Sequence, residues 1–144
     1  MRPGWDDWFL QGADWAAQRG DCSRRQVGAL IVRDDRVLAQ GYNGALPGER
    51  GCLAGGCPRA TSDVPPGSQY DHGPGACIAI HAELNAILDA ARRGIAIDGA
   101  AMYLNTAPCK TCRRLGWQAG IQVFVWRDAG EFQTLFRPVF RGES

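Results

Sequence analysis

The amino-acid sequence predicts an α/β fold in which helices flank a mixed β-sheet. Three observations lead to this class. Two short apolar runs, 26–33 and 36–42, are separated by Asp34 and Asp35, which is typical of a tight β-hairpin. Helical and strand-like patterns then alternate along the second half of the chain, as they do in sheets covered by helices. The chain has 144 residues, the size of one domain, so we expect residues 1–144 to form a single unit.

The first half of the chain begins with a predicted helix over residues 5–19. The side chains available for its core-facing side are Trp8, Leu10, Trp15 and Ala16. The hairpin follows this helix. Residues 44–76 come next; they are rich in Gly, Pro, Ser and Asp and have no apolar periodicity. A loop this long inside a compact domain is usually functional or held in place by a specific contact.

The second half of the chain supplies the remaining predicted elements. In order they are a helix over 77–92, a strand over 100–106, a helix over 108–120, a strand over 121–126 and a short helix near 130–136. The helix over 77–92 has apolar residues at helical spacing, namely Ile80, Leu84, Ile87, Leu88 and Ala91. Beside that stripe lie the imidazole of His81 and the carboxylate of Glu83, which are costly to bury without a partner.

Composition excludes some classes of protein and favours a metal site. The net charge is +1 and the sequence pI is about 7.6, which argues against stable binding of a long nucleic acid. No apolar stretch reaches the roughly 20 residues of a membrane span, and the N-terminus lacks a signal-peptide pattern, so we expect a cytoplasmic protein. In a reducing compartment, the six cysteines indicate metal ligation more than disulfide bonds.

Two short motifs together predict a catalytic zinc site. The first is His81-Ala82-Glu83, and the second is Pro108-Cys109-Lys110-Thr111-Cys112. Two thiolates and one imidazole leave the fourth position of a tetrahedral zinc for water, which is the arrangement of catalytic rather than structural sites. Glu83 would then lie beside the metal and transfer protons. Each motif alone has an ordinary structural explanation, but the pair in this order is the signature of zinc-dependent nucleobase deaminases.

The sequence also resembles the deoxycytidylate (dCMP) deaminase family over residues 19–128, in the stretches QVGALIV, GYNGALPG, IHAELNAILDAARRG, AAMYLNTAPCKTC and QAGIQVFVW. The resemblance implies the cytidine-deaminase-like three-layer sandwich, with a mixed five-stranded sheet flanked by helices. It implies zinc on His81, Cys109 and Cys112, with Glu83 as the proton shuttle. The implied reaction is hydrolytic attack on C4 of the cytosine ring of dCMP, giving dUMP, a precursor of thymidylate, and ammonia.

Less distinctive residues are assigned to the substrate through the same resemblance. Asn43 matches an asparagine that contacts the sugar of the substrate, although Asn-Gly is also a strong turn signal. Ser23, Arg24 and Arg25 lie where the family places part of its phosphate pocket, although a solvated basic turn explains them equally well. Arg92 lies near an arginine used for subunit contact or effector response, and it also suits the C-terminal end of a helix.

The four remaining cysteines, Cys22, Cys52, Cys57 and Cys77, offer a second zinc site that would hold the long loop. Some relatives hold a structural zinc with cysteines equivalent to two of these. His72 is a substitute ligand in that scheme, and the alternatives are free buried cysteines or disulfide bonds. The family resemblance further implies homo-oligomers, either hexamers or dimers, with dCTP as activator and dTTP as inhibitor. The segments WDDWFL and FQTLFRPVF are candidate interfaces.

Two other functions remain open from the sequence. One is deamination of another free nucleotide or nucleobase, including modified cytosine nucleotides, or of a polynucleotide. The other is a zinc-stabilised binding module without catalysis. The intact motif with Glu83 argues against the binding module, because a structural zinc has no use for a nearby proton-transfer group.

Overall fold

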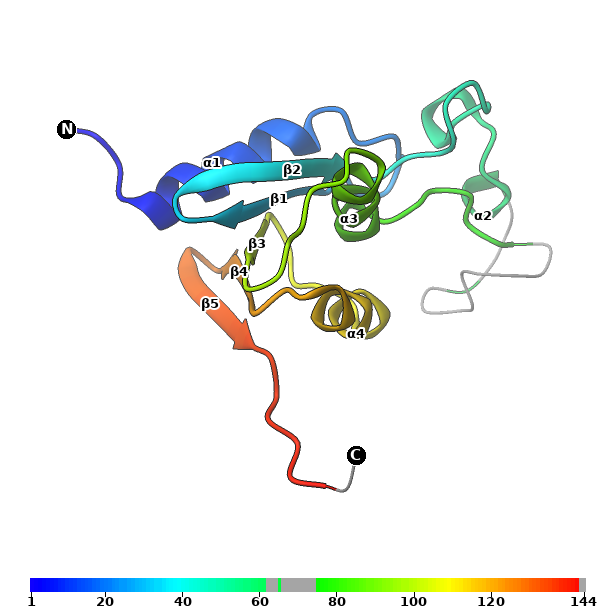
Figure 1. Ribbon diagram of the computed structural model, residues 1–144. Helices are drawn as coiled ribbons and strands as arrows, with labels where there is room; N and C mark the ends of the chain where they lie inside the picture. Colours follow the sequence, from blue (N-terminus) through cyan, green and yellow to red (C-terminus); the bar gives the residue numbers. More distant parts are fainter. Residues whose placement is uncertain (62–64, 66–74, 143–144) are drawn as a thin grey trace.

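The computed structural model describes residues 1–61, 65 and 75–142 of the chain (Figure 1). The elements are α1 (Trp5–Ala17), β1 (Gly28–Arg33), β2 (Arg36–Tyr42), the 3-10 turn η1 (Cys52–Ala54), α2 (Pro58–Thr61), α3 (Ala82–Arg92), β3 (Ala101–Leu104), α4 (Lys110–Ala119), β4 (Val123–Asp128) and β5 (Glu131–Phe136). The long connection after β2 therefore contains two short helical turns. No helix in the described part of the chain is long and apolar enough to cross a membrane.

The five strands form one mixed sheet in the order β2-β1-β3-β4-β5. β1 pairs antiparallel with β2 and β3, β3 pairs parallel with β4, and β4 pairs antiparallel with β5. The predicted hairpin is confirmed, because Arg33 pairs with Arg36 around Asp34 and Asp35. Both aspartates have positive φ, 53° and 58°, as a two-residue type I′ turn requires.

The last strand corrects one prediction, since residues 130–136 form β5 and not a short helix. Asp128 pairs with Glu131 across Ala129 and Gly130, which have φ of 50° and 83°. This second two-residue turn sends the chain back along β4 as an edge strand. The sequence offered little indication of the strand, because edge strands with exposed side chains have a weak alternating pattern.

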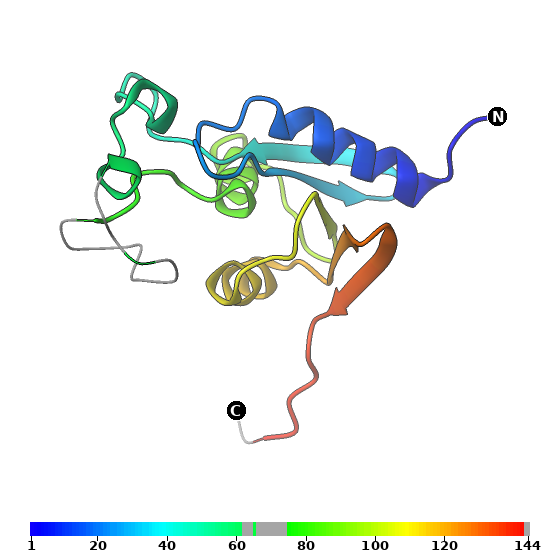
Figure 2. The ribbon, with the colours of Figure 1, turned by 180° about the vertical axis from the view of Figure 1, so that it is seen from behind.

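Helices cover both faces of the sheet, so the predicted three-layer sandwich is confirmed (Figures 1 and 2). On one face, α1 packs Phe9 and Leu10 against Leu30 and Val32 of β1. On the other face lie α3 and α4. This second core consists of Ala29, Ile31, Ala39, Ala82, Ala86, Ala90, Ile97, Ala100, Met102, Leu104, Ile121 and Phe124. Successive β1 residues thus alternate between two buried layers, which explains the continuous apolar run of that strand.

The predicted core-facing side of α1 is partly wrong. Trp8 and Trp15 are 55% and 63% exposed, whereas Ala13 is fully buried. The reason is the close approach of the helix to β1, where a Cβ on Gly28 would lie only 2.1 Å from the carbonyl oxygen of Ala13. Ala13 and Ala17 make this contact, and the two indoles lie on the exposed side of the helix.

The same reasoning corrects the predicted apolar stripe of α3. Its buried residues are Ala82, Glu83, Ala86 and Ala90, whereas Leu88 is 49% exposed. A Cβ on Gly41 of β2 would lie 2.4 Å from backbone atoms of α3. The helix therefore rests directly on the strand through its alanines, and the larger aliphatic residues lie at the side.

Candidate metal centre and active site

His81 lies at the N-cap of α3 and is held by the extended segment before the helix. Its backbone is extended, with φ −63° and ψ 149°. The preceding residue, Ile80, exchanges two backbone hydrogen bonds with Gly44, of 2.8 and 3.1 Å. The helix was expected to begin at residue 77, but it begins at Ala82 because this bridge keeps the preceding residue extended. The imidazole consequently projects from the end of the helix.

Cys109 occupies the matching position at the start of α4. It is the N-cap residue, and its Sγ accepts a hydrogen bond of 3.3 Å from the backbone N–H of Cys112. Pro108 was expected at the first helical position, but it precedes the cap. The cap residue and a first-turn residue thus place both sulfurs at one helix end.

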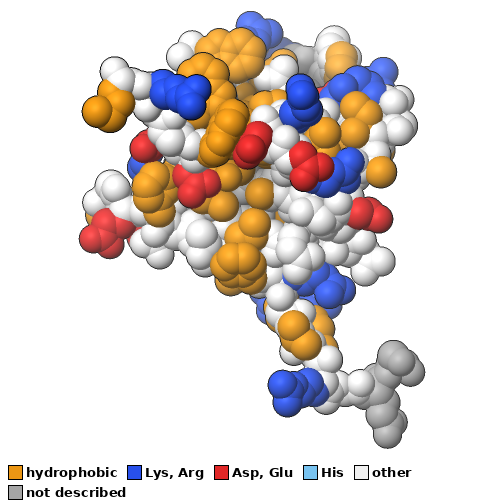
Figure 3. Space-filling model, turned by 60° about the vertical axis from the view of Figure 1, so that its left-hand side comes forward, with side chains coloured by type: hydrophobic (Ala, Val, Ile, Leu, Met, Phe, Trp, Pro, Cys, Tyr) orange, Lys and Arg blue, Asp and Glu red, His pale blue; other side chains and the backbone are white. Residues whose placement is uncertain are grey.

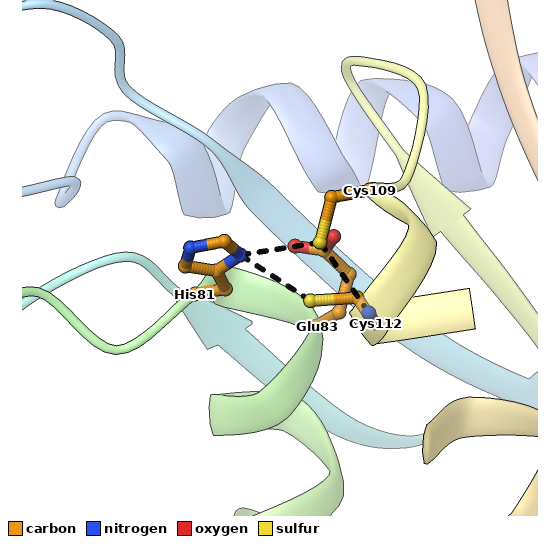
Figure 4. A group of neighbouring side chains, drawn as sticks. All are labelled: His81, Glu83, Cys109 and Cys112. Carbon is orange, nitrogen blue, oxygen red and sulfur yellow. Dashed lines mark hydrogen bonds between the residues drawn. The ribbon is translucent and has the colours of Figure 1, made fainter. Parts of the chain in front are cut away.

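The two helix ends meet, and four predicted site residues form one group (Figure 4). The donor atoms of His81, Glu83, Cys109 and Cys112 all lie within 4.8 Å of one another. The Nδ1 atom of His81 is 3.3 Å from Sγ of Cys112 and 3.6 Å from Sγ of Cys109. A nitrogen and a sulfur bound to one tetrahedral zinc would lie about 3.6 Å apart. The separations therefore fit a zinc ion held between these atoms.

Burial and charge also fit a cation at this point. Glu83 is only 4% exposed, and Cys112 is fully buried. Burial raises the pKa of the Cys112 thiol, and the nearby negative charge of Glu83 raises it further. A divalent cation removes this penalty, because a coordinating thiol is deprotonated by the metal. The donor set of one imidazole and two thiolates is one that zinc prefers.

The metal group lies on the wall of a cavity of about 350 Å³. Its described lining residues include His81, Glu83 and Cys109. The rest of the wall comes from the segment before β1, the end of β2, α2, the segment before α3 and the segment after β3. The size suits a small-molecule ligand. Glu83, His81 and Cys109 thus face the cavity, whereas Cys112 is buried behind them.

Asn43 is buried in this wall and joins the ends of two strands. Its Oδ1 accepts from the backbone N–H of Val27 at 2.9 Å, and its Nδ2 donates to the carbonyl of Arg25 at 2.9 Å. These bonds give Asn43 a structural role, which is the alternative to a substrate contact that the sequence left open. The same side chain lines the cavity, so a contact with substrate remains a prediction.

The three predicted residues of the segment before β1 do not all lie on the cavity wall. Arg24 and Arg25 line the cavity, and the guanidinium of Arg25 donates to the Thr106 hydroxyl at 3.5 Å. Ser23 is not among the described lining residues; its backbone N–H donates to Sγ of Cys52 at 3.3 Å. Arg92 lies exposed in the last turn of α3.

The four other cysteines come from the same end of the molecule but form a looser group. Sγ of Cys57 and Sγ of Cys77 are 3.9 Å apart, and Cys22 lies with Cys77 on the cavity wall. Burial raises the pKa of Cys57, but backbone N–H groups that include that of Ile78 lower it by more. In the described ranges, only the group containing His81 brings three or more donor atoms within 4.8 Å. His72 lies outside the described residues.

Sequence reasoning missed one residue of the cavity wall, Arg59, and one residue that joins β3 to the segment before β1, Asn105. Arg59, on α2, is buried in the cavity wall. Asn105 follows β3 and repeats the arrangement of Asn43: its Oδ1 accepts from the N–H of Gly28, and its Nδ2 donates to the carbonyl of Gln26, both at 3.0 Å. A polar residue directly after a strand was a usable signal for Asn105. No comparable pattern distinguished Arg59 within an irregular segment.

A layered sheet with two helices that begin at one His/Glu/Cys/Cys group is the site architecture expected of zinc-dependent deaminases. The chain belongs to the cytidine and deoxycytidylate deaminase family, since residues 3–127 match the family described as "Cytidine and deoxycytidylate deaminase zinc-binding region".

Individual relatives agree with this placement. The deoxycytidylate deaminase of Mycobacterium phage D29 is 45% identical over 126 residues, covering 87% of this chain and 95% of the relative. That of Schizosaccharomyces pombe is 42% identical over 129 residues; this chain spans 90% of its own length but 38% of that relative. The structure of cyanophage S-TIM5 dCMP deaminase with dCMP and dUMP matches with a TM-score of 0.67 and 26% identity, covering 88% of this chain and 82% of that one.

Proposed function

We propose that this chain catalyses the zinc-dependent hydrolytic deamination of dCMP to dUMP and ammonia. The observation that carries the proposal is the convergence of His81, Glu83, Cys109 and Cys112 on the wall of one small cavity. The names of the phage and yeast relatives support dCMP as the substrate. So does the similar cyanophage enzyme, whose structure holds dCMP and dUMP.

The residues of the site divide the chemistry between them. His81, Cys109 and Cys112 would hold the zinc, which supplies Lewis acidity that makes water a nucleophile near neutral pH. Glu83 takes a proton from the attacking water and delivers a proton to the departing amino group. Its burial beside Cys112 fixes the carboxylate where that transfer is needed. The cavity wall orients the nucleotide and limits access of bulk water.

The test is ammonia release by the zinc-loaded protein with a panel of substrates: dCMP, CMP, deoxycytidine, dCTP, dAMP, guanine and a cytosine-containing oligonucleotide. Glu83→Gln keeps the shape of the side chain but removes the proton acceptor, so turnover should be lost while the zinc content stays unchanged. Glu131→Gln, at an exposed position in β5, is the matched control and should behave like wild type.

The panel also decides between the two alternatives. Turnover of another nucleotide, a base or the oligonucleotide without turnover of dCMP would keep the chemistry and overturn the substrate. A protein that binds zinc but deaminates nothing, with wild type and Glu83→Gln alike, would favour a binding module.

We also propose that Cys22, Cys52, Cys57 and Cys77 bind a second, structural zinc. The 3.9 Å separation of the Cys57 and Cys77 sulfurs supports this, because two sulfurs on one tetrahedral zinc lie about 3.8 Å apart. Zinc would draw the other two sulfurs toward this pair. Elemental analysis should find two zinc ions per wild-type chain and one in Cys57→Ser. One zinc ion per wild-type chain would overturn the proposal.

Self-association is supported by exposed apolar side chains, some of which are visible on the face in Figure 3. Trp8, Trp15 and Val37 line a groove of about 750 Å³ between α1 and the edge strand β2. We propose that the chain forms homo-oligomers through such surfaces. Light scattering should give a mass that is a multiple of 15.6 kDa and a smaller mass for Trp15→Ser. A wild-type monomer would contradict this.

We further propose effector control by dCTP, as activator, and dTTP, as inhibitor, with Arg92 at an effector or subunit contact. Its exposed position at the end of α3 leaves it accessible for such a role. Rates measured with each effector at low dCMP concentration test this, and unchanged rates with both effectors would remove it.

A further inference from the structure

α3 lies along β2 and bonds to the backbone of that strand. β2 is an edge strand of the described sheet, so no strand pairs with its outer backbone groups there. Three side chains of α3 take that place: Asn85 donates to the carbonyl of Tyr42 at 2.7 Å, Asp89 accepts from the N–H of Gln40 at 3.2 Å, and Arg93 donates to the carbonyl of Leu38 at 2.7 Å. The helix thus contacts the strand through hydrogen bonds as well as through close packing at Gly41.

These three hydrogen bonds repeat at the same distance on both elements. The helix residues are four apart, which is about 6 Å along an α-helix, and the strand residues are two apart, which is about 6.6 Å along a β-strand. The three bonds can therefore form together in only one position of the helix along the strand. A shift by one residue would break all three, so this face of α3 fixes where the end of the helix lies relative to the sheet.

Asn85 is the member of this set that also holds the metal end of the helix. Its Nδ2 donates a second hydrogen bond, of 3.3 Å, to the carbonyl of Ile80, and its backbone N–H donates to the carbonyl of His81 at 2.9 Å. One residue therefore binds the carbonyl on either side of the His81 Cα. The imidazole that this backbone carries lies 3.3 and 3.6 Å from the sulfurs of Cys112 and Cys109 (Figure 4).

We propose that the side chain of Asn85 is a positioning group for the metal centre, which holds the backbone before His81 so that the imidazole is directed at the zinc. This inference rests on the proposed deaminase function and assigns a further residue to that same site. Asn85 is not among the described residues that line the cavity, so it acts through His81 and not on the substrate. Groups that orient a metal ligand commonly contribute about 10- to 100-fold to metal affinity or activity.

The experiment compares wild type with Asn85→Leu, Asn85→Gln and the control Arg93→Gln. Leucine has nearly the shape of asparagine but donates no hydrogen bond, whereas glutamine keeps the amide on a longer side chain. The control removes the hydrogen bond to Leu38 at the other end of the same helix, while Asn85 and Asp89 still fix the position of the helix.

Three measurements separate positioning from a general loss of stability: the dissociation constant of zinc by competition with a chelator, the visible spectrum of the cobalt(II) form, and kcat and KM for dCMP. Asn85→Leu should weaken zinc binding by roughly 10- to 100-fold, alter the bands of bound cobalt and lower kcat with little change in KM. Asn85→Gln should recover part of each loss, and Arg93→Gln should match wild type. Cys112→Ser, which lacks one ligand, identifies the zinc that belongs to this centre.

Other outcomes overturn the proposal. Equal losses in Asn85→Leu and Arg93→Gln would mean that both residues only stabilise the helix. A wild-type zinc affinity and cobalt spectrum in Asn85→Leu would mean that the amide does not position His81. If Asn85→Leu does not fold, Asn85→Ser, which also lacks the amide, is measured in its place, and the same results support or refute the assignment.

Zinc binding, measured without substrate, separates this proposal from the proposed function. If wild type binds zinc but deaminates nothing, and Asn85→Leu weakens that binding, the reaction is wrong and the positioning role is right. If wild type deaminates dCMP and Asn85→Leu binds zinc and turns over like wild type, the reaction is right and the positioning role is wrong. If wild type binds no zinc at the centre that contains His81, both are wrong.

Discussion

Replacing Gly41 by alanine should push the catalytic helix away from the sheet. A Cβ at this position of β2 would lie 2.4 Å from the carbonyl oxygen of Ala82 and from the amide nitrogen of Ala86. These are backbone atoms of α3, so no change of side-chain rotamer relieves the contact. The helix must shift by about 1 Å to restore an ordinary separation of 3.4 Å.

Two opposing effects determine how much Gly41→Ala lowers the free energy of unfolding. Overpacking a well-filled interior costs about 1–3 kcal/mol. Replacing glycine within a strand returns about 0.5–1 kcal/mol through the lower entropy of the unfolded chain. The free energy of unfolding should therefore fall by about 1–2 kcal/mol. Activity should fall more steeply, since His81 and Glu83 are carried on the displaced helix end and a 1 Å misplacement costs roughly 100-fold in rate.

Urea denaturation, zinc content and ammonia release from dCMP measure these effects. Gly44→Ala is the matched control, because a Cβ there would lie 3.7 Å from Cβ of Asp21, an ordinary contact. It should change stability by less than about 0.5 kcal/mol. A Gly41→Ala protein as stable and active as the control would refute the argument that this glycine sets the position of α3.

Three smaller perturbations test other contacts. The hydroxyl of Tyr103 donates a 2.6 Å hydrogen bond to Oδ1 of Asp6. Tyr103→Phe should therefore lower the free energy of unfolding, measured by urea denaturation, by about 1 kcal/mol. An unchanged denaturation midpoint would show that this hydrogen bond does not stabilise the fold. The hydrogen bond from Arg93 holds the pKa of Asp89 below its ordinary value of 3.8. The stability from this pair is present above that pH and is lost as the carboxylate protonates in acid. Both side chains are more than a third exposed, so Asp89→Asn should cost less than about 1 kcal/mol at pH 7 and nothing in strong acid; a cost that persists in acid would contradict this. Cys112→Ser should remove one zinc ion per chain and all ammonia release, whereas a fully loaded, active variant would exclude this sulfur as a ligand.

The four residues of the metal group were predictable because each motif is local. His81 and Glu83 are two residues apart, and Cys109 and Cys112 are three apart, so one helix start fixes the geometry of each pair. The hairpin was predictable for the same reason, since two aspartates at a turn define its register. The structure shows that the two helix ends meet, as the pair of motifs predicts.

The remaining features depend on how closely two elements approach each other, which periodicity does not show. Trp8 and Trp15 are apolar, but α1 approaches Gly28 through Ala13 and Ala17, and the two indoles lie on the exposed side of the helix. Arg59 lies in a segment without periodicity, and its place in the cavity wall depends on the path of the connection around it. Such positions are set by long-range packing, and no local pattern marks them.

The two helices of the site present their side chains in the same way, and the packing of the helices on the sheet determines the distance between these side chains. His81 and Cys109 are both N-cap residues with extended backbone, so their side chains project beyond the helix ends. Each first turn then adds one further group toward the same point. The distance between the two ends is set by the contacts of the helices with the sheet. On α3 that contact is Gly41; on α4 it is Gly116, where a Cβ would lie 2.6 Å from the ring of Phe124. Residues outside the metal group therefore determine its geometry, because a rigid helix transmits any shift at the sheet to the ligands at its end.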